Sequence, residues 1–197
     1  KPKESVDAVL EDAAEMGLKV VRTWGNLDAG VKTDKVSDKG YTVFTDSVDG
    51  SGEKEGVYYQ YFDADLGRPV VNEGEDGLQK LDYALYKAEQ EGIKLLITFT
   101  NNWEAFGGMG QYVQWAKLAG ENVSGHDDFY TNETIKGWYK DYIKTLLNHE
   151  NVYTGVKYKD DPTIFSWELA NEPRCESDAG CENNTVVKWA TEMSAYV

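Results

Sequence analysis

The sequence predicts an α/β fold in which parallel strands alternate with helices, and two patterns support this over the 197 residues. Segments of helical periodicity alternate with short apolar segments, in the order helix, strand, long insertion, helix, strand, helix, strand, helix. Each strand-like segment also runs into a polar segment in which Asn stands with Trp, Arg or Glu. This organisation is typical of repeated strand–helix units, and the length suits one sizeable domain.

The first unit is predicted as a helix over residues 5–16 and a strand over residues 19–24. Gly17 ends the helix, whose apolar side chains recur at helical spacing: Val6, Val9, Leu10, Ala13 and Ala14. Residues 25–74 then lack a helical period but contain aromatic segments at 41–44 and 57–62. We expect an elaborated loop with a small antiparallel hairpin, because so aromatic an insertion favours order over disorder.

The remaining units show the same order of a helix followed by a strand. A helix opens at Asp76-Gly77 and ends at Gly92, and residues 94–100 form the next strand. A third helix over residues 134–148 leads to a strand over 163–170, and a helix over 185–197 follows. The second helix is expected to direct these side chains inward: Leu78, Leu81, Tyr83, Leu85 and Ala88.

The last strand runs straight into Asn171-Glu172-Pro173. Its apolar run carries no charge before Glu168, which is typical of a strand covered on both faces. Pro173 ends the strand and favours an extended conformation at Glu172, so the carboxylate should point in a fixed direction at the strand tip. The tips of parallel strands are where chemistry takes place in such folds. An ordinary polar turn is the alternative.

Three strand ends should converge at one mouth, at residues 22–26, 101–104 and 171–174. They bring together a charged clamp, amide hydrogen-bonding groups, aromatic planes and a carboxylic acid. Sugar hydroxyls need polar partners, sugar rings need aromatic planes, and a glycosidic oxygen needs an acid beside a second carboxylate. The mouth is therefore suited to carbohydrate.

The amino-acid composition also limits the classes of ligand that the protein is expected to bind. A net charge of −15 argues against nucleic-acid backbones and anionic membranes. The apolar runs are too short to span a membrane, and no targeting segment stands at Lys1, so we expect mature protein. His126 and His149 have no partners at metal-ligand spacing, and no phosphate-binding or dinucleotide motif occurs, so neither a metal nor a cofactor is expected.

The cysteines and the glycosylation sequons indicate the cellular compartment in which the protein functions. Cys175 and Cys181, separated by five residues in a polar loop, suggest a local disulfide, with two free thiols as the alternative. Asn122, Asn132 and Asn183 each open an Asn-x-Ser/Thr sequon, a candidate glycosylation site. Together these features favour a secreted, extracellular protein.

Five segments in combination resemble the fungal and plant endo-β-1,4-mannanases of glycoside hydrolase family 5. They are residues 21–25, 77–82, 101–108, 129–132 and 167–175. Asn-Glu-Pro alone would indicate only the wider clan of retaining glycosidases, whereas Asn101-Asn102-Trp103 with its Gly-Gly pair and Arg174-Cys175 favour the mannanase branch.

The resemblance implies part of a (β/α)₈ TIM barrel, about strands 2 to 4 with their helices and an elaborated loop after strand 2. A whole barrel needs about 250 residues, so residues 1–197 are expected to be a partial catalytic domain, without the first strand and the C-terminal half. The family's nucleophile, a glutamate after the seventh strand, and a tryptophan after the eighth have no counterpart here. Glu104 is the nearest substitute, and it is better interpreted as a solvated loop charge.

The resemblance also implies roles. Glu172 would be the general acid and base, Asn171 would hold the sugar 2-hydroxyl, and Arg22 would keep the nucleophile ionised. Trp103 would contact a bound sugar, and Arg174 would reach the sugar on the leaving-group side. Trp24 and Asn102 are implied to belong to the site with less defined roles. The alternatives are a structural ion pair for Arg22 and core packing for Trp103.

The predicted function is endo-acting, retaining cleavage of β-1,4-mannosidic bonds in a polysaccharide, by a monomer. One alternative is a β-1,4-glucanase of the same fold. The other is a non-catalytic carbohydrate-binding domain, against which stands the Asn171-Glu172 pair, since a binder has no physical need for an acid at a strand tip.

Overall fold

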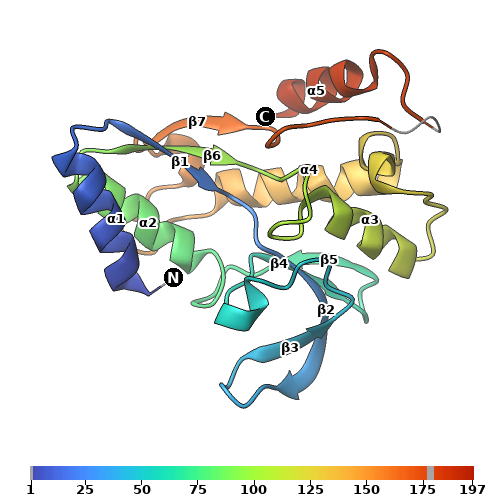
Figure 1. The fold of residues 1–197 in the computed structure, drawn as a ribbon, viewed down its shortest axis with the longest axis horizontal. Helices are drawn as coiled ribbons and strands as arrows, with labels where there is room; N and C mark the ends of the chain where they lie inside the picture. Colours follow the sequence, from blue (N-terminus) through green and yellow to red (C-terminus); the bar gives the residue numbers. More distant parts are fainter. Residues whose placement is uncertain (1, 177–179) are drawn as a thin grey trace.

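The computed structural model describes residues 2–176 and 180–197. Lys1, where the sequence shows no targeting segment, and residues 177–179 of the polar loop between the cysteines lie outside the described residues. The described part of the chain contains two β-sheets, one of three strands and one of four, together with helices (Figure 1).

The three-stranded sheet is parallel, as predicted. Its strands are β1 (Val20–Trp24), β6 (Lys94–Thr98) and β7 (Ile164–Glu168), in the order β1-β6-β7. Trp24 lies opposite Thr98, and Thr98 lies opposite Glu168, so the three carboxyl ends meet at one edge. This register is what brings residues from distant parts of the sequence into one site.

Four predicted helices are confirmed as α1 (Lys3–Glu15), α2 (Gln79–Gln90), α4 (Glu133–Asn148) and α5 (Thr185–Tyr196). The inward residues of α2 are buried except Tyr83, which is half-buried and donates to Asp7 of α1. On α1, Leu10 and Ala13 are buried, whereas Val9 is exposed because α1 packs mainly against α2 and leaves that side free.

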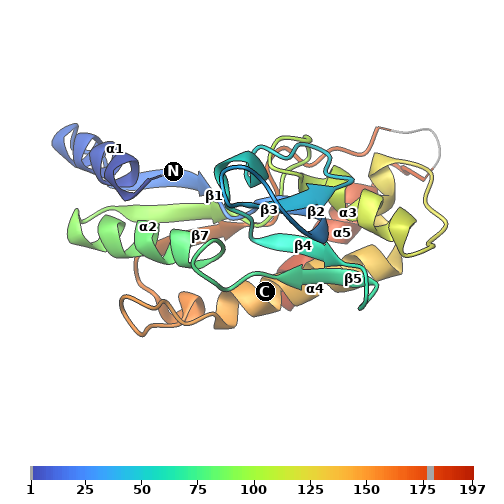
Figure 2. The same ribbon diagram turned by 90° about the horizontal axis from the view of Figure 1, so that it is seen from below.

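The insertion after β1 is more ordered than the small hairpin expected. Four strands form a second sheet in the order β3-β2-β4-β5, which lies beyond the carboxyl end of β1 (Figure 2). They are β2 (Asp28–Val36), β3 (Thr42–Thr45), β4 (Gln60–Asp63) and β5 (Arg68–Val71), with the 3₁₀ turn η1 (Glu53–Glu55) between them. The two aromatic segments do contain β3 and β4, but each pairs with a polar or mixed partner strand that periodicity did not reveal.

Helix α3 (Gly108–Leu118) was not predicted from the sequence. Most of its side chains are buried, including Met109, Gln111, Tyr112 and Trp115, so it shows no polar face to alternate with an apolar one. It also begins in a run of glycines, which suggests a loop. The 3₁₀ turns η2 (His126–Tyr130) and η3 (Tyr158–Asp160) complete the fold.

The prediction that the last strand is covered on both faces is wrong for the described sheet. β7 is an edge strand that pairs only with β6, and its residues are exposed or half-buried. Phe165 is 63% exposed. No strand of the described residues pairs with β7 beyond its free edge, and its side chains are more accessible than those of the central strand β6.

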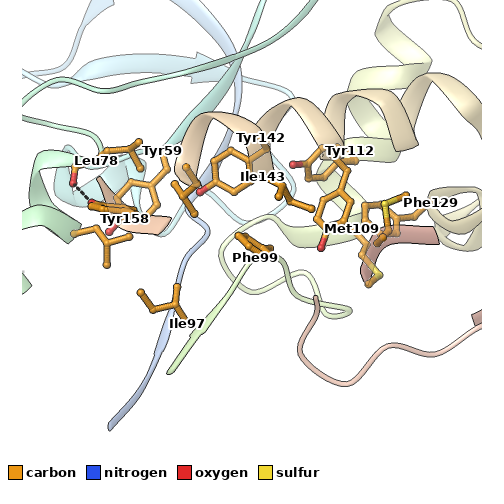
Figure 3. Packing of buried hydrophobic residues seen from close by; sticks show 14 of the residues in the cluster. Tyr59, Leu78, Ile97, Phe99, Met109, Tyr112, Phe129, Tyr142, Ile143 and Tyr158 are labelled. Carbon is orange, nitrogen blue, oxygen red and sulfur yellow. Dashed lines mark hydrogen bonds between the residues drawn. The ribbon is translucent and has the colours of Figure 1, made fainter. Parts of the chain in front are cut away.

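One continuous core joins the two sheets to the helices (Figure 3). Leu95, Ile97 and Phe99 from β6 and its end are buried, and Phe99 stacks against Trp167 of β7 with ring centroids 4.7 Å apart. Tyr142 of α4 and Tyr59 from the insertion lie in the same cluster. The insertion is therefore anchored into the body of the fold rather than attached loosely to its rim.

Candidate active site

The predicted site residues gather at the carboxyl ends of β1, β6 and β7. Beyond the strands, a bridge joins Asn101 to Asn171 and continues the parallel pairing past the end of β7. This extension brings the polar segments after β6 and β7 side by side, as the convergence of strand ends required.

Glu172 lies at the mouth of this arrangement with its side chain 53% exposed. Its Oε2 accepts a hydrogen bond from the indole nitrogen of Trp103 at 2.9 Å. The guanidinium of Arg174 donates to the same oxygen at 3.4 Å. Two donors from two different segments therefore fix the direction of this carboxylate.

Trp103 and Arg174 also contact each other. The guanidinium carbon of Arg174 lies 5.2 Å from the centroid of the Trp103 ring, a cation–π arrangement. Trp103 is 48% exposed, which rules out core packing as its role. An exposed indole at a strand end, held by an acid and a cation, can offer its ring to a flat apolar ligand face.

Asn171 lies beneath Glu172 and is buried. Its Oδ1 accepts from Arg22 at 2.9 Å, and its Nδ2 donates to Asn101 Oδ1 at 2.9 Å. The side chain is therefore oriented from both ends, with the oxygen toward β1 and the amide nitrogen toward the segment after β6.

Arg22 pairs with a residue that was not predicted. Its Nε donates to Glu168 Oε2 at 2.9 Å, and its Nη2 lies 2.7 Å from the same oxygen. The ion-pair alternative for Arg22 is therefore present, together with the bond to Asn171. The position of Glu168 was the one feature that could have predicted it. It ends β7 opposite Thr98 of β6, and Thr98 lies opposite Trp24 of β1.

Asn102 joins the segments after β6 and β7. Its backbone N–H donates to Asn171 O at 3.0 Å, and its Oδ1 accepts from the backbone of Arg174 at 3.1 Å. Tyr130 adds a donor to Asn102 at 3.4 Å and also accepts from Arg174 N at 2.8 Å. Asn101 and Tyr130 were not predicted as site residues, although both stand in the segments that carried the resemblance.

The extended conformation expected for Glu172 is wrong. Its φ is +49°, in the left-handed region that residues other than glycine rarely adopt. The chain is fixed by hydrogen bonds on both sides of Glu172, from Asn171 N to Thr100 O and from Arg174 N to Asn102 Oδ1. These tertiary bonds set the path of the chain and override the local preference that Pro173 imposes.

Trp24 and Glu104 lie at the margin of the candidate active site. The Trp24 ring packs against Phe106 with centroids 5.5 Å apart. This contact joins β1 to the loop that carries Trp103. Glu104 is exposed, in keeping with a solvated loop charge.

A buried carboxyl supports the loop from below. Asp28 is fully buried, accepts from Gln60 Nε2 at 2.8 Å and from Gly108 N at 3.1 Å, and donates its own N–H to Phe106 O. Burial raises the pKa of Asp28 to about 7, and the hydrogen bonds from Gln60, Asn26 and Gly108 oppose that rise. The insertion sheet thus holds the start of α3.

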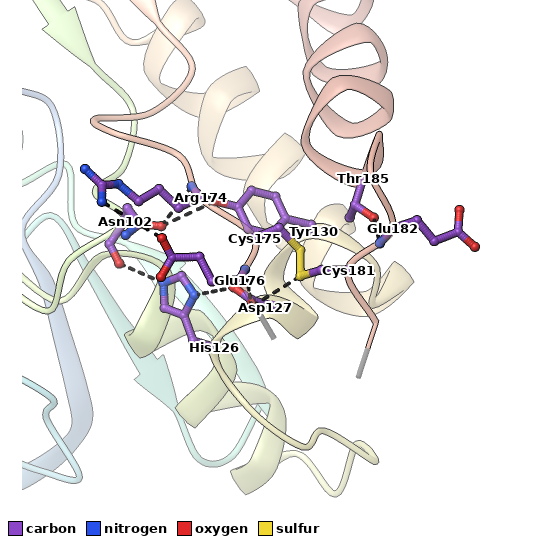
Figure 4. Close-up of a disulfide and its surroundings, with 10 residues drawn as sticks. All are labelled: Asn102, His126, Asp127, Tyr130, Arg174, Cys175, Glu176, Cys181, Glu182 and Thr185. Atoms are coloured by element: carbon purple, nitrogen blue, oxygen red, sulfur yellow. Dashed lines mark hydrogen bonds and ion pairs between the residues drawn. A yellow bond between two sulfur atoms is a disulfide. The ribbon is translucent and has the colours of Figure 1, made fainter. Parts of the chain in front are cut away.

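The local disulfide between Cys175 and Cys181 is confirmed, with Cα atoms 5.6 Å apart (Figure 4). It closes the loop that follows Arg174. Among the described residues one group of metal-ligand type is present, Asp127 with these two cysteines, but their sulfurs are joined to each other. His149, the residue after α4, is buried and contacts the buried Asp82 and the exposed Glu73.

The three sequon asparagines differ in their surroundings. Asn122 and Asn183 are exposed, whereas Asn132 caps α4 by accepting from Ile135 N at 3.0 Å. Its amide also donates to Glu121 at 3.4 Å, so a glycan on Asn132 would compete with that bond. In residues 2–176 and 180–197, no helix is long and apolar enough to cross a membrane.

Comparison with known proteins matches this arrangement to a family. The model described as GH family 5 beta-mannosidase-like matches residues 70–197. The chain belongs to glycoside hydrolase family 5. It is 38% identical over 195 residues to mannan endo-1,4-beta-mannosidase 7 of Arabidopsis thaliana, covering 99% of this chain and 37% of that protein.

Two fungal members of the family are similar to this chain to the same degree. It is 38% identical over 192 residues to mannan endo-1,4-beta-mannosidase F of Aspergillus clavatus, covering 98% of the chain and 36% of the relative. The solved endo-1,4-beta-mannanase of Rhizomucor miehei is 37% identical and superposes with a TM-score of 0.80, over 100% of this chain and 49% of that one. The resemblance and the fold class, part of a (β/α)₈ barrel, are confirmed. The chain spans under half the length of these relatives.

Proposed function

We propose that this chain carries the acid/base half of the active site of a retaining endo-β-1,4-mannosidase. The observation that supports it most is the carboxylate of Glu172, half-exposed at a strand tip and held on one oxygen by Trp103 and Arg174. Retaining glycosidases need such a carboxylic acid beside the leaving oxygen and a second carboxylate about 5 Å away.

In this proposal Glu172 protonates the glycosidic oxygen and then, as a base, deprotonates the water that releases the product. Asn171, oriented by Arg22 and Asn101, presents its amide to the 2-hydroxyl of the sugar whose bond is cleaved. Trp103 stacks on a sugar ring, and Arg174 contacts the sugar on the leaving-group side. Trp24 and Asn102 act by supporting the loops.

Residues 1–197 are proposed to be a partial catalytic domain, and the nucleophile is proposed to lie outside them, in a further part of the protein that completes the domain. Arg22 is 47% exposed while paired with Glu168, so its guanidinium has donors left for a second carboxylate. Such a pair would keep the nucleophile ionised, as attack on an anomeric carbon requires.

Mannan, glucomannan or galactomannan is the proposed substrate. The plant and fungal relatives are mannan endo-1,4-beta-mannosidases, which supports mannan over the alternative β-1,4-glucan. The same proposal includes a secreted monomer. Asn122 and Asn183 are preferred to Asn132 as glycosylation sites, because their side chains are exposed.

The test uses the full-length protein, soluble β-mannan and a soluble β-1,4-glucan. We expect a rapid fall in mannan viscosity relative to reducing ends, as internal cleavage gives, and little action on the glucan. Proton NMR should show that the newly formed reducing end is first the β-anomer. Initial α-anomer would refute retention, equal rates on both polymers would favour the glucanase, and binding without cleavage would favour the non-catalytic domain.

A further inference from the structure

His126 and Asp127 form a bridge between the two segments that hold Glu172. Trp103 comes from the segment after β6, and Arg174 comes from the segment after β7. Figure 4 shows the imidazole of His126 beside Asn102 and the carboxylate of Asp127 near Glu176 and Cys181. Neither His126 nor Asp127 is part of the site proposed above.

The contacts of this bridge are short. His126 Nε2 lies 2.7 Å from the carbonyl oxygen of Asn102, the peptide that leads directly into Trp103. His126 Nδ1 lies 2.9 Å from Asp127 Oδ1. The other oxygen of Asp127 accepts from the backbone N–H of Glu176 at 3.0 Å, two residues beyond Arg174.

The partner of His126 Nε2 shows which atom donates. The carbonyl oxygen of Asn102 only accepts, so the 2.7 Å contact requires a hydrogen on Nε2. The His126 side chain is 35% exposed, and its two contacts go to the next residue of η2, Asp127, and to the loop after β6 rather than to the core. A histidine that served only to fill the interior would not have this pattern.

We propose that His126 is a positioning residue for the acid: it fixes the Asn102–Trp103 peptide so that the Trp103 indole and Arg174 hold Glu172. This inference rests on the proposed acid/base role of Glu172. Trp103 reaches Glu172 through its single N–H, so a small rotation of the preceding peptide moves the donor off the carboxylate. The bond from His126 opposes that rotation.

The experiment uses a pair of variants of the full-length protein. In His126→Gln the amide nitrogen can reach the former Nε2 position and still donate to Asn102, whereas in His126→Asn it reaches only the former Nδ1 position. We expect His126→Gln to keep most of kcat/KM on mannan and His126→Asn to lose about tenfold, the order of one lost hydrogen bond. The loss should fall mainly on kcat.

The chemical signature separates positioning from simple instability. On an aryl mannoside with an acidic phenol, departure needs little protonation, so His126→Asn should lose much less than on mannan. His149→Asn serves as the control, because it disturbs the contacts of the buried His149 with Asp82 and Glu73, away from the site: it should lower thermal stability without this dependence on leaving group. Equal losses on both substrates, or equal activity of the Gln and Asn variants, would overturn the inference.

A spectroscopic arm does not depend on activity. In the full-length protein, the ¹⁵N imidazole signals of His126 are those that disappear in His126→Asn. We expect the His126 Nε2 signal to be that of a protonated nitrogen, and an unprotonated Nε2 would overturn the contact itself. If the parent enzyme fails to cleave mannan while this signal is present, the proposed function fails and the bridge stands.

Discussion

At Glu172, the local preference of the chain and its tertiary contacts oppose each other. Pro173 disfavours compact conformations of the residue before it, yet the hydrogen bonds of Asn171 and Arg174 hold Glu172 at φ +49°. Strain of this kind persists only where the surroundings over-determine it. The sequence predicted the residue and its place at the strand tip, but not its backbone, because the bonds involved come from residues about seventy positions away.

Asp28 gives a prediction about pH. Its pKa is raised to about 7 in the folded state, from an ordinary value of 3.8, because of burial. Between these values the folded protein holds the proton and the unfolded chain does not, so the free energy of unfolding falls as pH rises through this window. Asp28→Asn should flatten that slope, by at most about 1.4 kcal/mol per pH unit.

Urea unfolding at several pH values between 4 and 8 measures this difference. Asp38→Asn is the matched control, since Asp38 is exposed and should leave the slope of the parent unchanged. Parallel stability curves for the parent and Asp28→Asn would show that Asp28 is not protonated in the folded protein within this range.

At the scale of elements, the turn from β6 into α3 depends on glycine. Phe106, Gly107 and Gly108 all have positive φ, and a Cβ on Gly108 would lie 2.3 Å from Asn101 O and 2.7 Å from Trp103 O. Both are backbone atoms, so the loop itself would have to move. Gly108 N also donates to Asp28, which ties this turn to the insertion.

Two alanine substitutions test this turn. Gly108→Ala should destabilise the protein by about 1–3 kcal/mol or more and reduce activity through Trp103. Gly110→Ala, where the nearest atoms to a Cβ are 3.7 and 3.9 Å away within α3, should stabilise by about 0.4–1 kcal/mol. Thermal unfolding midpoints compare the two, and similar midpoints would contradict the account of this turn.

The elements also show what periodicity can and cannot predict. Helices α1, α2, α4 and α5 each have a polar side, so their apolar spacing was visible in the sequence. Helix α3 has almost no polar face, and strand β2 is polar along its outer half, so neither gave a signal. Strand pairing in the insertion depends on contacts between distant segments, which a linear pattern does not record.

For the whole molecule, the parallel order β1-β6-β7 made the site predictable. Once the strands were known to be parallel, their polar ends had to meet, which placed Arg22, Trp103 and Glu172 together. Glu168, Asn101 and His126 were not predicted because each contacts a partner on another segment. The net charge of −15 is compatible with a neutral polysaccharide and adds no specificity of its own.

The central claim is that Glu172 is the acid/base of a retaining mannanase, and Glu172→Gln in the full-length protein tests it most directly. The variant keeps the shape of the side chain and loses its proton. We expect mannan cleavage to fall by at least about 100-fold while glycosylation by an aryl mannoside with an acidic phenol is largely retained, because that leaving group needs no acid. Azide should then accelerate turnover and yield a β-mannosyl azide. Undiminished mannan hydrolysis, or an α-configured azide product, would contradict the account.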